Sequence, residues 1–340
     1  MKRTMKKMVS MALTGTMAVA VLAGAGTSEV KAADKAKIGV LVADVSGEEA
    51  QGFRSYYENY IAGNYDVEFN YTDALQSAED EKTAIEKFAS QGCQAIISFS
   101  SNDRVQQIET CEKYGVYYAV ASGVLDDAQY ETYKTYEYFA GQVGPGNDTE
   151  FEAGKDMGAY YKEQGVSKVA IYGAFIPNPM HVYRVAGVLN GLGCTYGGES
   201  DMNAIAGQIF QDQTVDLSKV EGDVEVVSYL QGYGDTTTDE LNAAIQKTPD
   251  AFISVGMATT FFAQSLSEAG ISFSDIDSFT ETNGNSMKNG TLTYLAGKYS
   301  SSIGPVFALV MNAINGNVIR DEDGNAPSIS QGYLVATDSD

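Results

Sequence analysis

Histidine and cysteine, which often act as bases, nucleophiles or zinc ligands, are scarce in this sequence. It has one histidine, His181, and three widely spaced cysteines, Cys93, Cys111 and Cys194, which form no CxxC pair. A Ser–His or Cys–His pair, and most zinc sites, would therefore depend on His181 itself. The sequence also has no GxSxG turn and no glycine-rich phosphate loop after a strand. We expect a protein that is not an enzyme and that uses no cofactor and no metal.

Polar and aromatic side chains follow several apolar runs of strand length. In an open parallel sheet a ligand binds beyond the carboxyl ends of the strands, so these residues are candidate ligand contacts. In the first half of the chain they are Asp44, Ser46, Phe53, Ser100, Ser101, Asn102, Asp103 and Ser122. In the second half they are Phe175, Asn178, Arg184, Tyr233, Met257, Thr280, Asn283 and Lys298.

Several candidates also have an ordinary structural interpretation. The ring of Phe53 could stack on a ligand or pack between helix and sheet. The run Ser100–Asp103 could offer hydroxyl, amide and helix-start N–H groups, and at least one of its residues should cap the following helix. Arg184 has a rigid fork of donors that suits a carboxylate, a phosphate or two hydroxyls, or it could pair with a nearby acid. We expect His181 to cap a helix or to lie at the surface.

The elements that position these residues alternate along the chain from Lys37 onward. Continuous apolar runs indicate strands that are buried on both faces, and helical spacing of apolar residues indicates the helices between them. In the first half we predict strands at Lys37–Ala43, Val67–Tyr71, Ala95–Phe99, Tyr117–Ala121 and Tyr136–Val143. The helices predicted between them are Gln51–Ile61, Ser77–Gln91 and Asn102–Tyr114.

The rhythm restarts after Val143. The second half has predicted helices at Glu150–Gln164, His181–Leu192, Asp239–Lys247, Thr259–Ala269 and Ile303–Ile314. Its predicted strands are Lys168–Tyr172, Glu225–Leu230, Ala251–Val255, Ser278–Thr282, Thr291–Ala296 and Gly332–Ala336. Two successive βα units of this kind predict an α/β protein with two doubly wound parallel-sheet lobes.

The first 32 residues have the pattern of a secretory signal peptide. A basic start with Lys2 and Arg3 precedes a weakly apolar stretch, and Val30-Lys31-Ala32 fits a cleavage site. The alternative is a membrane anchor, but a membrane-spanning helix needs about 20 mainly apolar residues, which this weakly apolar stretch does not provide. The formal net charge of −23 argues against nucleic acid as a partner, because nucleic acid attracts clustered Lys and Arg. We expect an exported monomer.

Several motifs resemble the type I periplasmic binding proteins, and the ribose-binding-like, lac-repressor-type sugar receptors of ABC transporters above all. The opening KIGVLVADVSGEEAQGF, the segment Val143-Gly-Pro-Gly-Asn147 before Gly154, and Arg184-Val-Ala-Gly187 are similar to family motifs. Lys298 stands where the family has a hinge glutamine. The resemblance implies two lobes joined by three crossovers near Val143, Lys298 and residues 323–328. It also implies that Arg184 lines the cleft.

This resemblance implies lobes at residues 33–143 plus 298–325 and at 144–297 plus 326–340. Its implied function is that of an extracytoplasmic solute-binding protein that passes a small polar ligand, such as a sugar or nucleoside, to ABC permease subunits. A receptor for a membrane kinase or chemoreceptor and a hydrolase on a doubly wound fold are the alternatives. Ala25 replaces the cysteine of a lipoprotein motif, so we expect an extracellular or periplasmic protein without a lipid anchor.

The family's sugar-binding carboxylates have no clear counterparts here. Ala121-Ser122 replaces an Asp–Arg pair, Val255-Gly256 replaces an Asn–Asp pair, and no aspartate is evident in Thr280–Asn283. We therefore expect a small ligand that is neutral or carries an anionic group bound by Arg184. Replacing Arg184 with alanine is expected to weaken binding and to leave folding intact.

Overall fold

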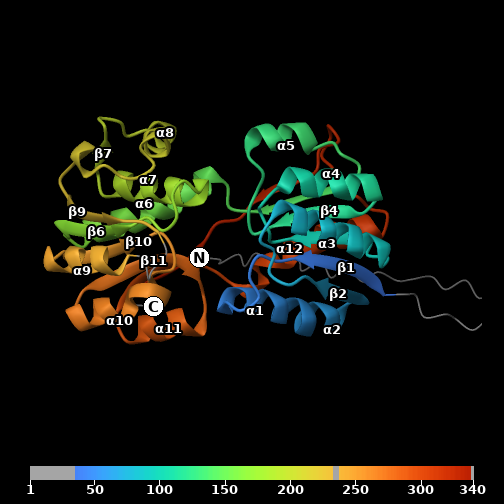
Figure 1. The fold of residues 1–340 in the computed structure, drawn as a ribbon, viewed down its shortest axis with the longest axis horizontal. Helices are drawn as coiled ribbons and strands as arrows, with labels where there is room; N and C mark the ends of the chain where they lie inside the picture. Colours follow the sequence, from blue (N-terminus) through green and yellow to red (C-terminus); the bar gives the residue numbers. More distant parts are fainter. Residues whose placement is uncertain (1–34, 233–236, 338–340) are drawn as a thin grey trace, which may run out of the picture. The chain divides into compact units, whose positions relative to one another are not determined.

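The computed structural model describes residues 35–232 and 237–337 (Figure 1). The predicted signal peptide, residues 1–32, and the candidate Tyr233 lie outside the described residues. Over the described ranges, no helix combines the length and the hydropathy that a membrane crossing needs.

The first half of the chain forms a six-stranded sheet in the order β13-β5-β4-β3-β1-β2, and every pairing in it is parallel. Its strands are β1 (Ala36–Leu41), β2 (Val67–Tyr71), β3 (Ala95–Ser98), β4 (Tyr117–Ala121), β5 (Phe139–Gly144) and β13 (Ser328–Ser330). All four residues of β3 are buried, as expected for a central strand with both faces covered.

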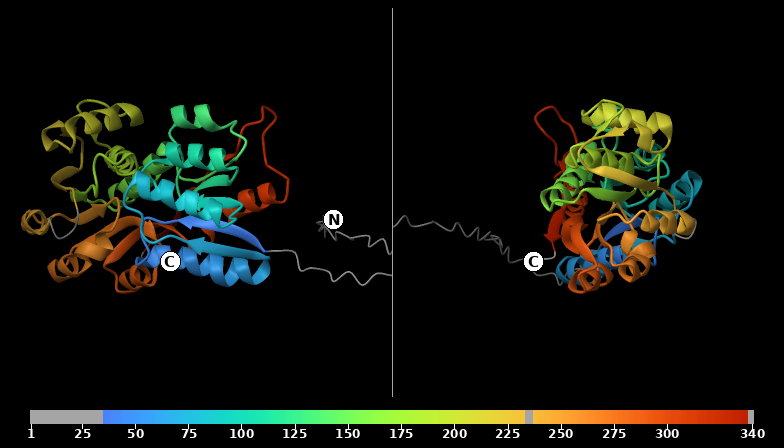
Figure 2. Two further views of the ribbon diagram at one scale, coloured as in Figure 1. Left: turned by 45° about the vertical axis from the view of Figure 1, so that its right-hand side comes forward. Right: turned by 90° about the vertical axis from the view of Figure 1, so that its left-hand side faces the viewer.

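Helices cover both faces of this sheet (Figures 1 and 2). The helices are α1 (Glu48–Ser55), a π-helical turn (Tyr56–Ile61), α2 (Ala62–Asn64), α3 (Ala78–Ser90), α4 (Arg104–Tyr114), α5 (Asp127–Tyr133), a 3-10 turn (Ser300–Ile303) and α12 (Gly304–Ile314). Ile97 packs in a cluster with Phe53 of α1 and Phe307 of α12. Its neighbour Ile96 packs in another cluster with Phe88 of α3. Adjacent strand residues thus supply the cores on opposite faces.

The second half forms another six-stranded sheet, in the order β14-β12-β11-β10-β6-β9. Its strands are β6 (Lys168–Tyr172), β9 (Glu225–Leu230), β10 (Ala251–Ser254), β11 (Ser272–Ser278), β12 (Leu292–Lys298) and β14 (Leu334–Thr337). β14 is antiparallel to β12, and the other pairings are parallel. The predicted fold class, two doubly wound α/β units, is confirmed.

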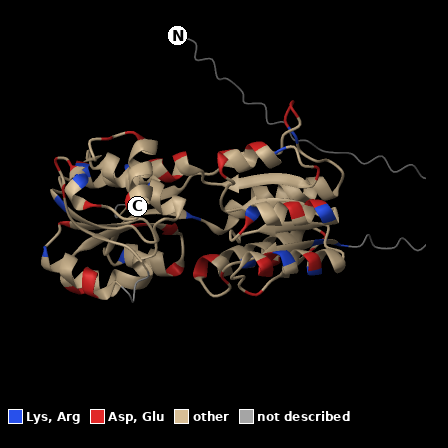
Figure 3. Ribbon diagram, turned by 45° about the horizontal axis from the view of Figure 1, so that its top comes forward, with Lys and Arg blue, Asp and Glu red and all other residues tan. Residues whose placement is uncertain are grey.

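Six helices and a short ribbon accompany the second sheet. The helices are α6 (Asn147–Glu163), α7 (Pro179–Gly191), α8 (Met202–Asp212), α9 (Thr238–Gln246), α10 (Ala258–Ala269) and α11 (Glu281–Lys288), and a 3-10 turn spans Leu217–Lys219. The ribbon pairs β7 (Thr195–Tyr196) with β8 (Val220–Glu221). Acidic residues are spread over the helices of both halves (Figure 3).

One strand prediction is wrong. The segment Ser278–Thr282 is not a strand, because β11 occupies Ser272–Ser278 and α11 begins at Glu281. Polar residues conceal β11 in the sequence: Ser272, Ser274, Asp275, Asp277 and Ser278 make up most of it. The elements α5, α8, α11, β7, β8 and β13 were not predicted.

The chain passes between the two sheets three times. It leaves the first sheet after β5 and returns to it after β12. Because β13 pairs with β5 and β14 pairs with β12, the third passage lies between Ser330 and Leu334. The predicted position of this crossover, residues 323–328, is therefore a few residues too early, because the short strand β13 still belongs to the first sheet.

Candidate ligand-binding site

A cavity of about 420 Å³ lies where α1 begins, beside the ends of β11 and β12. It is lined by Glu48, Glu49, Gln51, Gly52, Phe53, Ser278, Phe279, Thr280, Glu281, Lys298, Tyr299 and Ser300. Its volume falls within the usual range for small-molecule sites. Of the predicted ligand contacts, Phe53, Thr280 and Lys298 line this cavity. Thr280 follows β11, Lys298 is the last residue of β12, and Phe53 lies in the helix that follows β1.

The two glutamates at the start of α1 bind residues near the start of α11. Ser278 Oγ donates to Glu49 Oε1 over 2.5 Å. Thr282 donates to Glu48 from its backbone nitrogen over 3.2 Å and from its hydroxyl. The hydrogen bonds from Thr282 hold the pKa of Glu48 below its usual value. Neither glutamate was among the predicted ligand contacts.

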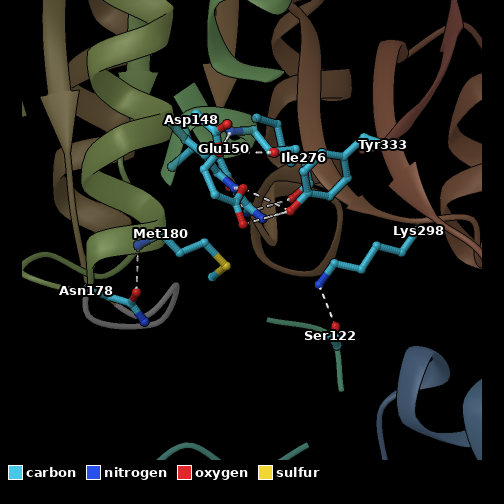
Figure 4. A network of polar contacts seen from close by, with 12 residues as sticks. Ser122, Asp148, Glu150, Asn178, Met180, Ile276, Lys298 and Tyr333 are labelled. Carbon is cyan, nitrogen blue, oxygen red and sulfur yellow. Dashed lines mark hydrogen bonds and ion pairs between the residues drawn. The ribbon is translucent and has the colours of Figure 1, made fainter. Parts of the chain in front are cut away.

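Lys298 reaches the other sheet. Its Nζ donates to Ser122 Oγ over 2.9 Å, and Figure 4 shows the two side chains pointing toward each other. Ser122 has a φ of 57°, in the left-handed region that a serine adopts rarely. These two predicted residues, 176 positions apart in the sequence, therefore meet.

Arg184 is buried and bound by protein groups. Its Nε lies 2.6 Å from Glu150 Oε2, one terminal nitrogen donates to Val255 O over 2.7 Å, and the other donates to Tyr333 Oη over 2.6 Å (Figure 4). The Tyr333 hydroxyl donates to Glu150 in turn. Burial alone would lower the pKa of Arg184, but Glu150 and Tyr333 raise it above its usual range.

This network leaves few donors of Arg184 for a ligand. The nitrogen bound to Val255 also lies 3.4 Å from Ile276 O, so at most one of the five guanidinium N–H groups stays unused. The Arg184-Val-Ala-Gly187 motif has a packing explanation as well, since a Cβ on Gly187 would lie 2.0 Å from Phe151 O of α6.

His181 and its neighbours form a compact turn before α7. The Phe175 N–H lies 3.0 Å from Nδ1 of the buried His181. Burial, and secondarily the charge of Arg184, lowers the pKa of His181 to about 4, so the ring is neutral at physiological pH. The expectation that His181 lies at the surface or caps the helix is therefore wrong. The side chain of His181 is buried, and Asn178 caps this helix by accepting from Met180 N over 3.0 Å.

Two candidates after strands of the second sheet are exposed apolar side chains. Phe175 is 50% exposed and Met257 is 38% exposed. Met257 also has a left-handed φ of 69° just before α10. Neither residue lines the cavity.

The run Ser100–Asp103 wraps around the buried carboxylate of Glu81. Ser100 Oγ donates to it over 2.5 Å, and the backbone nitrogens of Asn102 and Asp103 donate over 2.9 Å each. The Asp103 side chain caps α4 through Gln106 N. The prediction that this run caps a helix is confirmed. The other hydrogen-bond donors of the run bind the carboxylate of Glu81. Ser101 is exposed.

The remaining candidates have local partners. Asp44 accepts from the Ser46 backbone and hydroxyl, which shapes the turn before α1. Phe53 is buried and stacks on Phe99 with ring centroids 5.4 Å apart. Thr280 caps α11, and Asn283 Nδ2 donates to Ser278 O over 2.7 Å.

Because β11 was predicted at the wrong residues, two of its aspartates were not among the candidate ligand contacts. Asp275 is fully buried and accepts from Ser254 Oγ over 2.9 Å, and burial raises its pKa to about 8. Asp277 accepts from Asn283 over 3.2 Å, and burial raises its pKa too. Phe273 and Ile276 are the only apolar residues of β11 and they do not alternate, so the pattern gave no signal that could have located these aspartates. Among residues 35–232 and 237–337, no three His, Cys, Asp or Glu side chains are grouped to hold a metal ion.

Solved structures with the same architecture cover almost the whole chain. A solute-binding protein of an ABC transporter from Actinobacillus succinogenes 130z, with bound D-allose, superposes with a TM-score of 0.67 at 16% identity, over 90% of this chain and 98% of that one. A solute-binding protein from Bacillus halodurans C-125, with bound myo-inositol, gives a TM-score of 0.65 at 17% identity, over 91% and 96%.

The chain has the type I periplasmic-binding-protein fold. The arabinose-binding component of an ABC transporter from Shewanella sp. ANA-3 shares this fold too, with a TM-score of 0.64 at 16% identity over 89% of this chain and 92% of that one. No protein-family model and no curated protein sequence matches the chain. At these identities the likeness concerns the periplasmic-binding-protein fold, and the ligand has to be argued from the cavity.

Proposed function

We propose that this protein is a solute-binding protein that captures a small polar molecule in the cavity beside α1, β11 and β12 and passes it to an ABC importer. The observation that carries the proposal is the position of the cavity. It lies at the carboxyl ends of strands, and its lining comes from elements of both sheets. In this type of fold, such a position allows a ligand to hold two lobes together.

The lining suits a hydroxyl-bearing ligand. Ser278, Thr280 and Ser300 supply hydroxyl groups, and Phe53 supplies an apolar ring. Sugars and polyols occupy the structures of similar fold from Actinobacillus and Bacillus. We therefore propose a sugar-like ligand of comparable size, and we propose that binding leaves it chemically unchanged.

The proposal includes the predicted lobes and the predicted export. The predicted bounds at residues 298 and 325 shift slightly, because Lys298 ends β12 of the second sheet and β13 pairs with β5 of the first. The first lobe would comprise residues 33–143 plus 299–330, and the second would comprise residues 144–298 plus 331–340. Export would follow cleavage of the segment 1–32, and the protein would act outside the cytoplasm as a monomer beside its permease. The contacts Lys298–Ser122 and Glu49–Ser278 would then join the lobes in the closed state.

A thermal-shift screen of sugars, polyols, nucleosides and amino acids tests this function. A ligand that binds only the native state increases the free energy of unfolding by RT ln(1 + [L]/Kd). The melting temperature rises as a result. The tightest ligand should be recovered unaltered after long incubation. Phe279→Ala, at an exposed ring in the cavity lining, should weaken its binding about tenfold, whereas Ile319→Ala, at an exposed side chain elsewhere, should not. A ligand that is turned over, or equal effects of the two variants, would refute the proposal.

A further inference from the structure

We propose that the ligand of this cavity carries a positive charge, and that the protein binds a small polyhydroxylated molecule with a primary ammonium group. This inference rests on the proposed function and names the class of ligand. It differs from the sequence-based expectation of a neutral or anionic ligand, because Arg184 is bound to Glu150 and Tyr333.

The charged groups in the lining are mostly carboxylates. Glu48, Glu49 and Glu281 line the cavity, and Lys298 is the basic residue among the lining residues. The Lys298 ammonium donates to the neutral hydroxyl of Ser122. Among the described residues, no Lys, Arg or His lies within 4.0 Å of these three carboxylates. Three carboxylates against the one ammonium of Lys298 give the lining a formal excess of negative charge.

A fourth carboxylate, on Asp277, adds to this charge from behind Ser278. Burial raises the pKa of Asp277, and the charge of Glu49 raises it further. The hydrogen bond from Asn283 and the more weakly acting charges of Arg184 and Lys298 oppose this rise. The negative charges of Glu49 on α1 and Asp277 on β11 therefore repel each other. An ammonium group placed in the cavity would relieve this repulsion.

The aromatic lining favours a cation for a separate reason. Phe279 and Tyr299 are each 39% exposed, and Phe53 is the third ring of the cavity. Aromatic faces attract ammonium groups through the ring quadrupole. Rings alone would also accept the apolar face of a neutral sugar. Rings together with carboxylates that have no ion-pair partner favour the ammonium form.

Calorimetry with matched amine–alcohol pairs tests the charge of the ligand. The probes are D-glucosamine with D-glucose, D-galactosamine with D-galactose, and D-mannosamine with D-mannose, all at pH 6 so that the amines are protonated. In the pair that binds tightest, we expect the amine to bind about tenfold tighter than the alcohol, which corresponds to one charge-assisted hydrogen bond. Glu49→Gln should remove most of this preference. Glu225→Gln, which removes the same charge from an exposed position on β9, should keep it.

Each other outcome overturns the inference in a distinct way. If the alcohol binds as tightly as the amine, the positive charge is wrong and the receptor function stands. If Glu49→Gln keeps the preference, the assignment of the ammonium to this cavity is wrong. If no member of any pair binds, the proposed class of ligand is wrong, and the broader screen described above decides the receptor function separately.

Discussion

Of the ion pairs between described residues, Arg184 with Glu150 is the one in which both side chains are buried. Both side chains are about 95% buried, and the Tyr333 hydroxyl bridges them. Because Tyr333 lies just before β14, the network joins α6 and α7 to the segment that passes between the sheets. Its role is therefore to hold this segment against the helices.

Replacing Arg184 with alanine should lower the free energy of unfolding by about 3–5 kcal/mol, because it leaves the Glu150 carboxylate buried without its partner. The expectation that this substitution leaves folding intact is thereby revised. Urea denaturation followed by circular dichroism measures the effect. Adding Glu150→Gln to the Arg184→Ala variant should restore part of the loss.

The exposed pair of Arg54 and Glu58 provides the control. Arg54→Ala should cost less than about 1 kcal/mol, because exposed ion pairs contribute little. Equal losses for the two arginine variants would contradict a special role for the buried network.

At this scale the sequence predicted candidates but not their partners. Arg184 was identified from its position in a motif, whereas Glu150 and Tyr333 lie 34 and 149 positions away along the chain. The donors of Ser100–Asp103 are similarly bound by Glu81, from the preceding helix. A residue type shows what a side chain can bind, and only the fold shows which group is near it.

At the scale of elements, close packing of α6 against α7 depends on glycines. A Cβ on Gly154 of α6 would lie 2.0 Å from Arg184 O, and one on Gly187 of α7 would lie 2.0 Å from Phe151 O. Side chains at these positions would force the two helices apart. The approach of the helices brings Arg184 to Glu150.

Gly187→Ala should therefore destabilise the protein by about 1–3 kcal/mol, the usual cost of overpacking. Gly207 offers a control of opposite sign, since it lies inside α8 with open space around its Cα. Gly207→Ala should raise the free energy of unfolding by up to about 1 kcal/mol through higher helix propensity. Thermal unfolding of both variants tests the pair, and a stabilising Gly187→Ala would refute the packing argument.

Elements with a clear apolar pattern were predicted within a few residues. β2, β4, β6 and β9 have the predicted bounds. β11 was misplaced because its buried polar residues are satisfied inside the protein: Asp275 accepts from Ser254 and from Thr259 N. A pattern of hydrophobicity does not reveal a strand whose polar groups find partners only in the folded state.

At the scale of the whole molecule, the two-sheet architecture followed from the restart of the strand–helix rhythm after Val143. The sequence could not predict that the start of α1 meets the start of α11. That contact joins residues 234 positions apart, through Glu48 and Thr282. Loop contacts of this kind have no periodic signal, so the cavity they line was only partly predicted.

The stability of the molecule should depend on pH through Asp275. Burial, and secondarily the charge of Asp277, raises the pKa of Asp275 to about 8, so it is protonated in the folded state at neutral pH. In the unfolded chain it ionises near pH 4. Between these values the folded state binds more protons, and the free energy of unfolding falls as pH rises. The net charge of −23 acts in the same direction through self-repulsion.

His181 acts in the opposite direction, but only below its unfolded pKa of about 6.5. Above pH 6.5 this opposing effect is lost, and the slope reflects Asp275 together with its neighbour Asp277. There, urea denaturation of the unaltered protein should show that the free energy of unfolding falls by up to about 1.4 kcal/mol per pH unit.

Asp275→Asn keeps the shape and the hydrogen bond from Ser254 without the charge, so it should flatten this slope. Asp223→Asn, at an exposed turn, should leave the slope unchanged. If Asp275→Asn retains the slope of the unaltered protein, Asp275 ionises normally in the fold, and the pH dependence arises from Asp277 and net charge.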